Sequence, residues 1–196
     1  IRGAGNLLGP EQHGHMETVG YDMYLRLLDE AIAEMKGEPT KRANIETSVE
    51  FKVPAHIDAR YIPDEDQRID MYKSIASVEN EDEAMDICDE LIDRYGDIPE
   101  ETRNLIDIAL IKNMAVSLGF SSVKEKDNMV ILSYAEQTAI DPKVIGEIIG
   151  KWRGRLMFSA GRQPYLSYRV KSDEKRDLLR NIKILLHDMV KLQSSH

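Results

Sequence analysis

Cysteine, tryptophan and phenylalanine are scarce in this chain of 196 residues, which has one Cys, one Trp and three Phe. A single cysteine excludes an internal disulfide framework and a four-cysteine zinc site, and it suits a reducing compartment. No apolar run approaches the roughly 18 residues that a membrane span needs, and 31% of the residues are charged. We therefore expect a globular, cytoplasmic chain with no membrane contact.

The chain also lacks the short motifs of common enzymes. It has no G-x-x-x-x-G-K-[ST] phosphate loop, no G-x-S-x-G nucleophile elbow and no H-E-x-x-H helix. Gly3, Gly5 and Gly9 do not have the spacing of a dinucleotide-binding loop. We expect no catalytic residue and no cofactor in this chain.

Two further candidates for chemistry have plainer explanations. Cys88 lies in a stripe with helical core spacing, which favours a buried structural thiol over a nucleophile. His13 and His15 could join Glu11 and Glu17 as metal ligands. Two histidines separated by one residue are a weak signal, however, so we favour a solvated turn and predict no metal.

The first fourteen residues combine glycines with two polar side chains, and we interpret them as a loop motif entered part-way. Arg2 and Gln12 are the groups that such a loop could direct at a partner. The glycines permit backbone conformations that other residues avoid, and they are Gly3, Gly5, Gly9 and Gly14.

A change of pattern predicts a domain boundary near residue 44. Apolar residues at helical spacing predict a helix over 17–36, and the polar stretch 37–44 with its Gly and Pro reads as a linker. Alternation over 45–53 then predicts a half-buried strand. We expect residues 1–43 to be the tail of one motif, and 44–196 to form a separate domain.

Three helices are expected next. Asp64 with Gln67, and Asn80 with Glu83, are capping-box patterns that mark the first two starts. Pro99 fits the first turn of a third helix, which runs to Gly119 and is apolar nearly all round. This third helix should be the most buried one.

The last third of the chain mixes strands and helices, which gives an α+β fold of short antiparallel hairpins covered by about five helices. Asp141 and Pro142 begin one helix, and a final helix starts at Ser172. The hairpins are expected to pair 121–125 with 129–134, and 155–160 with 165–170.

Charge is distributed unevenly, with a net −3 over residues 1–53, −12 over 54–110 and +6 over 111–196. The acidic middle contains a helical stripe that Arg94 alone interrupts. This stripe either meets a basic partner or simply keeps the helix solvated. Its members are Asp82, Asp86, Asp89, Glu90, Asp93 and Asp97.

The basic C-terminal third supports an alternative function, because cations interleaved with Trp152, Tyr165 and Tyr168 could hold single-stranded nucleic acid. The helical spacing of the tryptophan argues instead for a place in the core. The basic residues are Lys151, Arg153, Arg155, Arg162, Arg169, Lys171, Lys175, Arg176, Arg180 and Lys183.

Two longer motifs and the glycine loop together carry a family resemblance. The stretches RYIPDEDQRIDMYKSIA and DELIDRYGDIPEETRNLIDIA, with RGAGNLLG at the start, resemble the C-terminal part of the bacterial transcription-repair coupling factors. The glycine loop resembles the end of a translocation motif that this family shares with fork-reversal helicases.

The resemblance implies a parent that is an ATP-dependent double-stranded-DNA translocase, with its ATP and Mg²⁺ site upstream of this chain. Such a parent acts on stalled RNA polymerase and recruits the excision-repair machinery. By the same resemblance, Arg2 and Gln12 couple ATP hydrolysis to movement on DNA, while His13 stands where the family commonly has Ser. The C-terminal domain is expected to dock on an N-terminal repair-protein-like module and repress the motor, with Glu90 and Asp93 at the interface.

Overall fold

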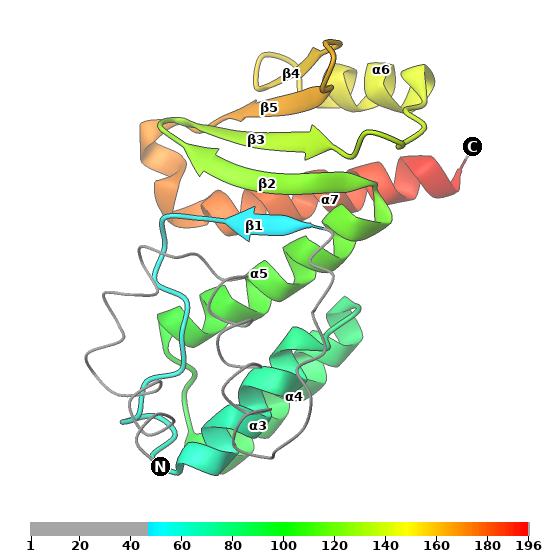
Figure 1. Cartoon of the computed structure of the whole chain (residues 1–196). Helices are drawn as coiled ribbons and strands as arrows, with labels where there is room; N and C mark the ends of the chain where they lie inside the picture. The colour runs from blue at the N-terminus through cyan, green and yellow to red at the C-terminus, as the bar shows by residue number, and fades with distance from the viewer. Residues whose placement is uncertain (1–46, 196) are drawn as a thin grey trace. The chain divides into compact units, whose positions relative to one another are not determined.

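The computed structural model describes residues 47–195, and these divide into two compact units (Figure 1). The first unit comprises residues 52–110, and the second comprises 47–51 together with 111–195. The glycine loop with Arg2 and Gln12, the histidine pair, the helix expected over 17–36 and the boundary near residue 44 all lie outside the described residues.

The first unit contains α3 (Glu65–Ala76), α4 (Glu81–Tyr95) and the start of α5 (Glu100–Ser117). Both predicted caps are confirmed. Asp64 Oδ1 accepts a hydrogen bond from the Gln67 N–H at 2.9 Å, and Asn80 Oδ1 accepts one from the Glu83 N–H at 3.0 Å. The Glu83 carboxylate also stabilises this helix start, because it accepts from Asn80 Nδ2 at 3.0 Å and from the Glu79 N–H at 2.8 Å.

Hydrogen bonds from buried side chains hold the loop before α3 in place. The hydroxyl oxygen of Tyr72 accepts from the Ile57 N–H at 2.8 Å, and the buried guanidinium of Arg68 donates to the Ile62 carbonyl at 2.6 Å. These bonds satisfy backbone groups that would otherwise be buried without partners. Helix α5 is largely buried, as predicted, although Val116 in its last turn is 46% exposed.

The second unit is built on a five-stranded sheet in the order β1-β2-β3-β5-β4. Both predicted hairpins are confirmed as antiparallel pairs, β2 with β3 and β4 with β5. The first strand is shorter than the alternation suggested, since 51–53 lie outside it, and it pairs parallel to β2. The strands are β1 (Ser48–Glu50), β2 (Phe120–Lys126), β3 (Met129–Tyr134), β4 (Leu156–Ser159) and β5 (Tyr165–Arg169).

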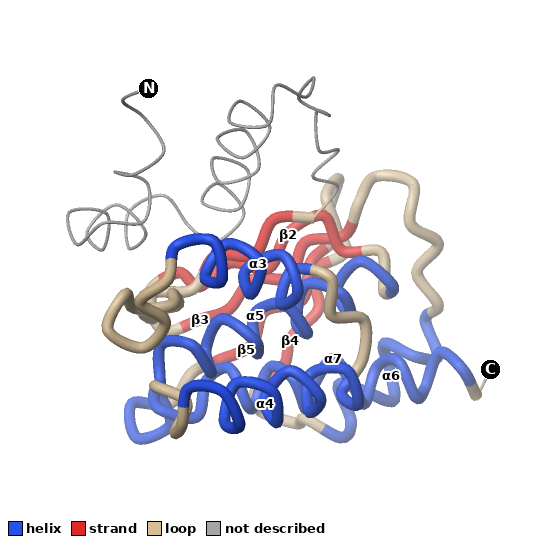
Figure 2. The backbone as a smooth tube through the Cα atoms, turned by 90° about the horizontal axis from the view of Figure 1, so that it is seen from below, coloured by secondary structure: helices blue, strands red, loops and turns tan. Residues whose placement is uncertain are grey.

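Two helices cover one face of this sheet, α6 (Pro142–Lys151) and α7 (Leu178–Ser194) (Figure 2). Asp141 caps α6 through its side chain, as predicted. The final helix was expected from Ser172, but Ser172–Asp177 forms a 3₁₀ helix and the α-helix begins at Leu178. The six polar residues of the 3₁₀ segment include none that is buried, so they have no apolar face to pack against a core.

The pleat of the strands gives the sheet two different faces. Val123, Leu132 and Leu166 are fully buried on the face that α6 and α7 cover. Neighbouring residues along each strand point the other way, and several of them are exposed. The architecture of the described residues is therefore α+β, as the sequence predicted.

Candidate functional site

Helix α4 presents a continuous acidic face. All of its members are exposed, and Glu90 Oε1 accepts from Arg94 Nη1 at 2.5 Å across one helical turn. This hydrogen bond is the main reason that the pKa of the Arg94 guanidinium is raised above its ordinary value. Asp97 was assigned to the same stripe but lies beyond the helix, which ends at Tyr95 before Gly96 turns the chain at φ 83°. The acidic face of α4 therefore consists of Asp82, Asp86, Asp89, Glu90 and Asp93.

Asp93 and Glu90 differ in the charge that they can offer a partner. The carboxylate of Glu90 is engaged by Arg94, whereas no ion pair within residues 47–195 involves Asp93. Since like charges at helical spacing repel by a few tenths of a kcal/mol per pair, the acidic face is mildly unfavourable by itself. A cationic partner would relieve this repulsion.

Two apolar side chains border the acidic face: Met85, which the sequence reasoning missed, and Ile92, which was wrongly expected in the core stripe with Cys88. Met85 is 62% exposed and Ile92 is 45% exposed, while Ala84 and Leu91 form the buried side of the helix. Met85 and Ile92 are seven residues apart, so they lie on one side of the helix, two turns from each other. Their spacing in the sequence could have revealed an apolar strip wider than the core requires.

The end of α4 is anchored by its aromatic residue. The Tyr95 hydroxyl donates to Gln67 Oε1 at 2.8 Å, and its ring meets that of Tyr61 edge-on at 5.9 Å between centroids. The Tyr61 hydroxyl in turn donates to the Gly96 carbonyl at 3.1 Å. These contacts hold the helix that carries the acidic face against the rest of the first unit.

Cys88 was predicted to be a buried structural thiol, but it is only half-buried. Cys88 is only half-buried because it lies at the edge of the buried stripe of α4 and not at its centre. Ala84 and Leu91 occupy the buried side of the helix.

The aromatic residues proposed for nucleic-acid stacking are largely used inside the second unit. Tyr168 is fully buried, and Trp152 Nε1 donates to Asp188 Oδ2 at 3.1 Å. Their rings meet edge-on, with centroids 5.9 Å apart. Burial raises the pKa of the Tyr168 hydroxyl. Of the three predicted stacking residues, only Tyr165 is exposed on the surface.

Two of the predicted basic residues also have internal partners. Arg155 forms an ion pair with Glu174 and donates to the Tyr168 hydroxyl, and Lys151 Nζ lies 2.6 Å from Asp188 Oδ1. These pairs tie the 3₁₀ segment to the sheet and α6 to α7. Contact of nucleic acid with the remaining basic residues stays a prediction.

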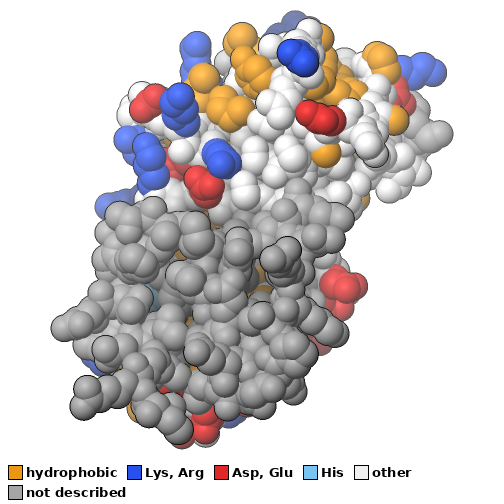
Figure 3. Space-filling model, in the orientation of Figure 1, with side chains coloured by type: hydrophobic (Ala, Val, Ile, Leu, Met, Phe, Trp, Pro, Cys, Tyr) orange, Lys and Arg blue, Asp and Glu red, His pale blue; other side chains and the backbone are white. Residues whose placement is uncertain are grey.

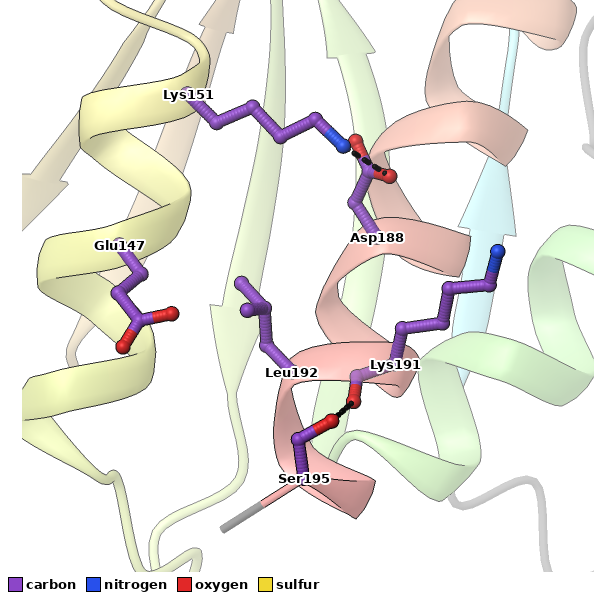
Figure 4. Close-up of a pocket in the computed structure, with 6 residues that line it drawn as sticks. All are labelled: Glu147, Lys151, Asp188, Lys191, Leu192 and Ser195. Atoms are coloured by element: carbon purple, nitrogen blue, oxygen red, sulfur yellow. Dashed lines mark hydrogen bonds and ion pairs between the residues drawn. The ribbon is translucent and has the colours of Figure 1, made fainter.

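A groove of about 390 Å³ lies between α6 and α7 (Figure 4). Lys151 reaches across it to Asp188, while Lys191 points away from α6. Ser195 Oγ donates to the carbonyl of its own helix at Lys191, at 2.9 Å. The hydroxyl hydrogen of Ser195 is therefore used within the end of α7.

The described residues contain no cluster of three or more metal-ligating side chains. Across 47–195, no helix is both long and apolar enough to cross a membrane. Of the predicted site residues, the structure brings Glu90 and Asp93 together on one exposed face. Arg2, Gln12 and the loop glycines fall in the part of the chain that it does not describe.

Comparisons with known proteins agree with the resemblance that the motifs suggested. The TRCF domain family matches residues 51–145. The transcription-repair-coupling factor of Bacillus subtilis (strain 168) is 40% identical over 141 residues, which is 72% of this chain and 12% of the relative. The corresponding protein of Staphylococcus aureus (strain USA300) is 37% identical over 152 residues, 77% of this chain and 13% of the relative.

A solved structure supports the fold. The crystal structure of the C-terminal domain of transcription-repair coupling factor superposes with a TM-score of 0.70 at 20% identity, covering 76% of this chain and 95% of that domain. The chain spans only 12–13% of the length of the relatives named above. With its family match, its relatives and its fold in agreement, the chain belongs to the transcription-repair coupling factor family and corresponds to the C-terminal domain of that family.

Proposed function

We propose that this chain is the C-terminal part of an ATP-dependent DNA translocase that couples transcription to nucleotide-excision repair, and that it represses the motor by docking within the parent protein. The acidic face of α4 carries this proposal. Its exposed carboxylates, bordered by Met85 and Ile92, suit a partner surface that is basic and partly apolar. The proposed partner is the N-terminal repair-protein-like module of the same parent chain.

The proposed docking is a competition for one surface. While α4 occupies the N-terminal module, that module cannot bind the excision-repair machinery, and the motor stays repressed. Engagement of RNA polymerase and double-stranded DNA favours the released state of the parent. Because Glu90 is already paired with Arg94, Asp93 contributes more of the new charge interaction, and Glu90 must exchange one partner for another.

ATPase measurements on the full-length parent test this latch. Asp93→Asn should raise the basal ATPase activity because it removes a carboxylate that forms no ion pair within residues 47–195, and Glu90→Gln should raise it less. Asp70→Asn makes the same charge change on an exposed residue of α3 and should leave the activity at the wild-type level. Activity of Asp93→Asn as low as wild type would show that the acidic face is not the latch.

Binding in trans gives a second readout that does not depend on the motor. The 196-residue chain should bind the isolated N-terminal module, and this binding should weaken as salt is added because exposed charges are screened. Asp93→Asn should weaken it further, while Asp70→Asn should not. If the affinity changes neither with added salt nor in the Asp93→Asn variant, the interface is not based on charge.

For the glycine loop, the proposal is that Arg2 and Gln12 couple ATP hydrolysis, carried out by the upstream motor, to movement on DNA. Arg2→Ala or Gln12→Ala in the parent should leave ATP hydrolysis largely present and abolish productive translocation. Displacement of stalled RNA polymerase measures this directly. Normal displacement by either variant would refute the coupling role.

A further inference from the structure

The face of the sheet opposite α6 and α7 carries an exposed surface to which the preceding proposal gives no role. Figure 3 shows hydrophobic side chains gathered over the strands of this unit, with Lys and Arg side chains beside them. We call this surface the open face. The strand register arranges its side chains in rows across β2, β3, β5 and β4.

One end of the open face is basic. The register places Lys126, Met129 and Arg169 in one row, and the Val170 N–H donates to the Asn128 carbonyl at 2.8 Å, which brings Lys171 close to the same turn. Lys126, Arg169 and Lys171 are exposed, and no ion pair among residues 47–195 involves them. Exposed acids nearby in the sequence are Asp127 in the turn and Asp173, two residues after Lys171. This end therefore suits an anionic ligand.

The remainder of the open face combines apolar side chains and hydroxyls, with the Lys124–Glu50 ion pair at its β1 edge. Met157 on β4 is 66% exposed and Tyr165 on β5 is 37% exposed, while Ile131 on β3 is half-buried. Serines fill the gaps, because Ser133 pairs with Tyr165, and Ser167 lies opposite both Ile131 and Met157. The exposed ring of Tyr165 and the apolar side chains beside it offer a surface on which a base can stack.

A hollow of about 490 Å³ lies at the Tyr165 end of the sheet. Amide side chains of Gln137 and Gln163 line it with the Ser121 hydroxyl and the Glu136 carboxylate. Amides and hydroxyls supply both donors and acceptors, which is the combination that the edge of a nucleobase requires.

We propose that the open face binds single-stranded nucleic acid, with phosphates at Lys126, Arg169 and Lys171 and unstacked bases over Tyr165, Ile131 and Met157. A basic end followed by an aromatic and apolar platform is the combination that holds single strands. Residues 165 and 169 are about 13 Å apart along the strand, so phosphate and base groups can occupy different ends of the face.

The alternatives fit these observations less well. Duplex DNA keeps its bases stacked and would leave the exposed Met157 and Tyr165 without a role. An acidic peptide could pair with the cations, but it would gain little from the hydroxyls and amides around Tyr165. This site is independent of the acidic face of α4, which lies in the other unit.

Fluorescence anisotropy with the full 196-residue chain tests the proposal. The probe is a labelled single strand of thymidylates of about 15 nucleotides, compared with a duplex of equal length. The single strand should bind more tightly, and log K should fall with log salt at a slope of about −2, as expected for three phosphate contacts on a single strand.

Variants assign the binding to the open face. The double variant Lys126→Ala with Arg169→Ala should reduce the salt slope to about −0.7. Tyr165→Ala should weaken binding about fivefold or more, whereas Tyr165→Phe should retain it because the ring can still stack. Arg180→Ala removes one exposed charge from α7, on the covered side of the sheet, and should leave the affinity unchanged.

Three results would overturn the proposal. The first is the absence of binding at low salt by a wild-type chain with a normal circular dichroism spectrum. The second is an equal loss of affinity in Arg180→Ala and Arg169→Ala, which would indicate attraction by net charge rather than by a site. The third is displacement of the oligonucleotide by polyglutamate at equal charge concentration, which would mean that the bases contribute nothing.

Discussion

The acidic face of α4 and the open face of the sheet differ in charge and in construction. On α4, all the charged groups come from one stretch of 12 residues, from Asp82 to Asp93. On the sheet, the groups come from four strands, and Lys126 and Arg169 are 43 positions apart in the chain. A helix surface is thus encoded locally, whereas a sheet surface depends on strand register.

The two surfaces also depend on different stabilising interactions. The side chains behind the open face, such as Leu132 and Leu166, are completely buried, whereas α4 buries only Ala84 and Leu91. We therefore expect the sheet to be sensitive to changes in its core and α4 to depend more on its cap.

Leu132→Ala should destabilise the second unit by about 3 kcal/mol, because it removes a fully buried side chain and leaves a cavity. Urea denaturation followed by the fluorescence of Trp152, the one tryptophan of the chain, measures the free energy of unfolding. Met157→Ala, on the exposed side of the same sheet, should change it by less than about 0.5 kcal/mol. Equal costs for the two variants would contradict the two-faced sheet.

Tyr134 should make the stability of the second unit fall in alkali. Burial raises the pKa of its hydroxyl above the ordinary value, so its contribution is complete below the unfolded value near 10 and is lost as the pH rises toward the folded pKa. At pH 11 the loss should be about 1.4 kcal/mol. The free energy of unfolding of Tyr134→Phe should fall less than that of wild type between neutral pH and pH 11. Parallel curves for the two proteins would refute this assignment.

Asn80→Ala should cost about 1 kcal/mol of unfolding free energy, because it removes the side-chain N-cap of α4 and the side-chain bond from Asn80 to Glu83. Urea denaturation followed by circular dichroism of the helices measures the change. Asn80→Ser keeps a capping oxygen and should retain most of the stability. A loss in Asn80→Ser as large as in Asn80→Ala would show that the side-chain cap is not what stabilises the helix.

Glu90→Gln should have the smallest effect on stability, a few tenths of a kcal/mol, since its ion pair with Arg94 is about half exposed on both sides. The same urea titration, repeated in high salt, should find the difference reduced. A loss above about 1 kcal/mol would give the pair a structural role and weaken the view of α4 as a docking surface.

Local signals in the sequence predicted much of the fold. The caps at Asp64, Asn80 and Asp141 mark the starts of α3, α4 and α6, and both hairpins pair as expected. The family resemblance also agrees with the comparisons. These features succeed because capping, alternation and motif spacing involve residues close together in the chain.

The site predictions also succeeded for residues close together in the chain, and were left undecided for residues far apart. Glu90 and Asp93 could be placed on one exposed face because they are three residues apart on a helix. The aromatic and basic C-terminal residues could not be separated by sequence into internal and surface groups. Tyr168 is buried and Tyr165 is exposed, although both belong to β5.

By itself, the sequence determined the capped starts of α3, α4 and α6, both hairpins, the acidic face of α4 apart from Asp97, and the family. Each of these depends on spacings within one element or on motifs read directly along the chain. Only the tertiary structure decided that β1 pairs parallel to β2, that Trp152 and Arg155 serve internal contacts, and that Lys126, Arg169 and Tyr165 share one open face. The reason is physical: strand order and register join residues far apart in sequence, and the choice between core and surface follows from that pairing.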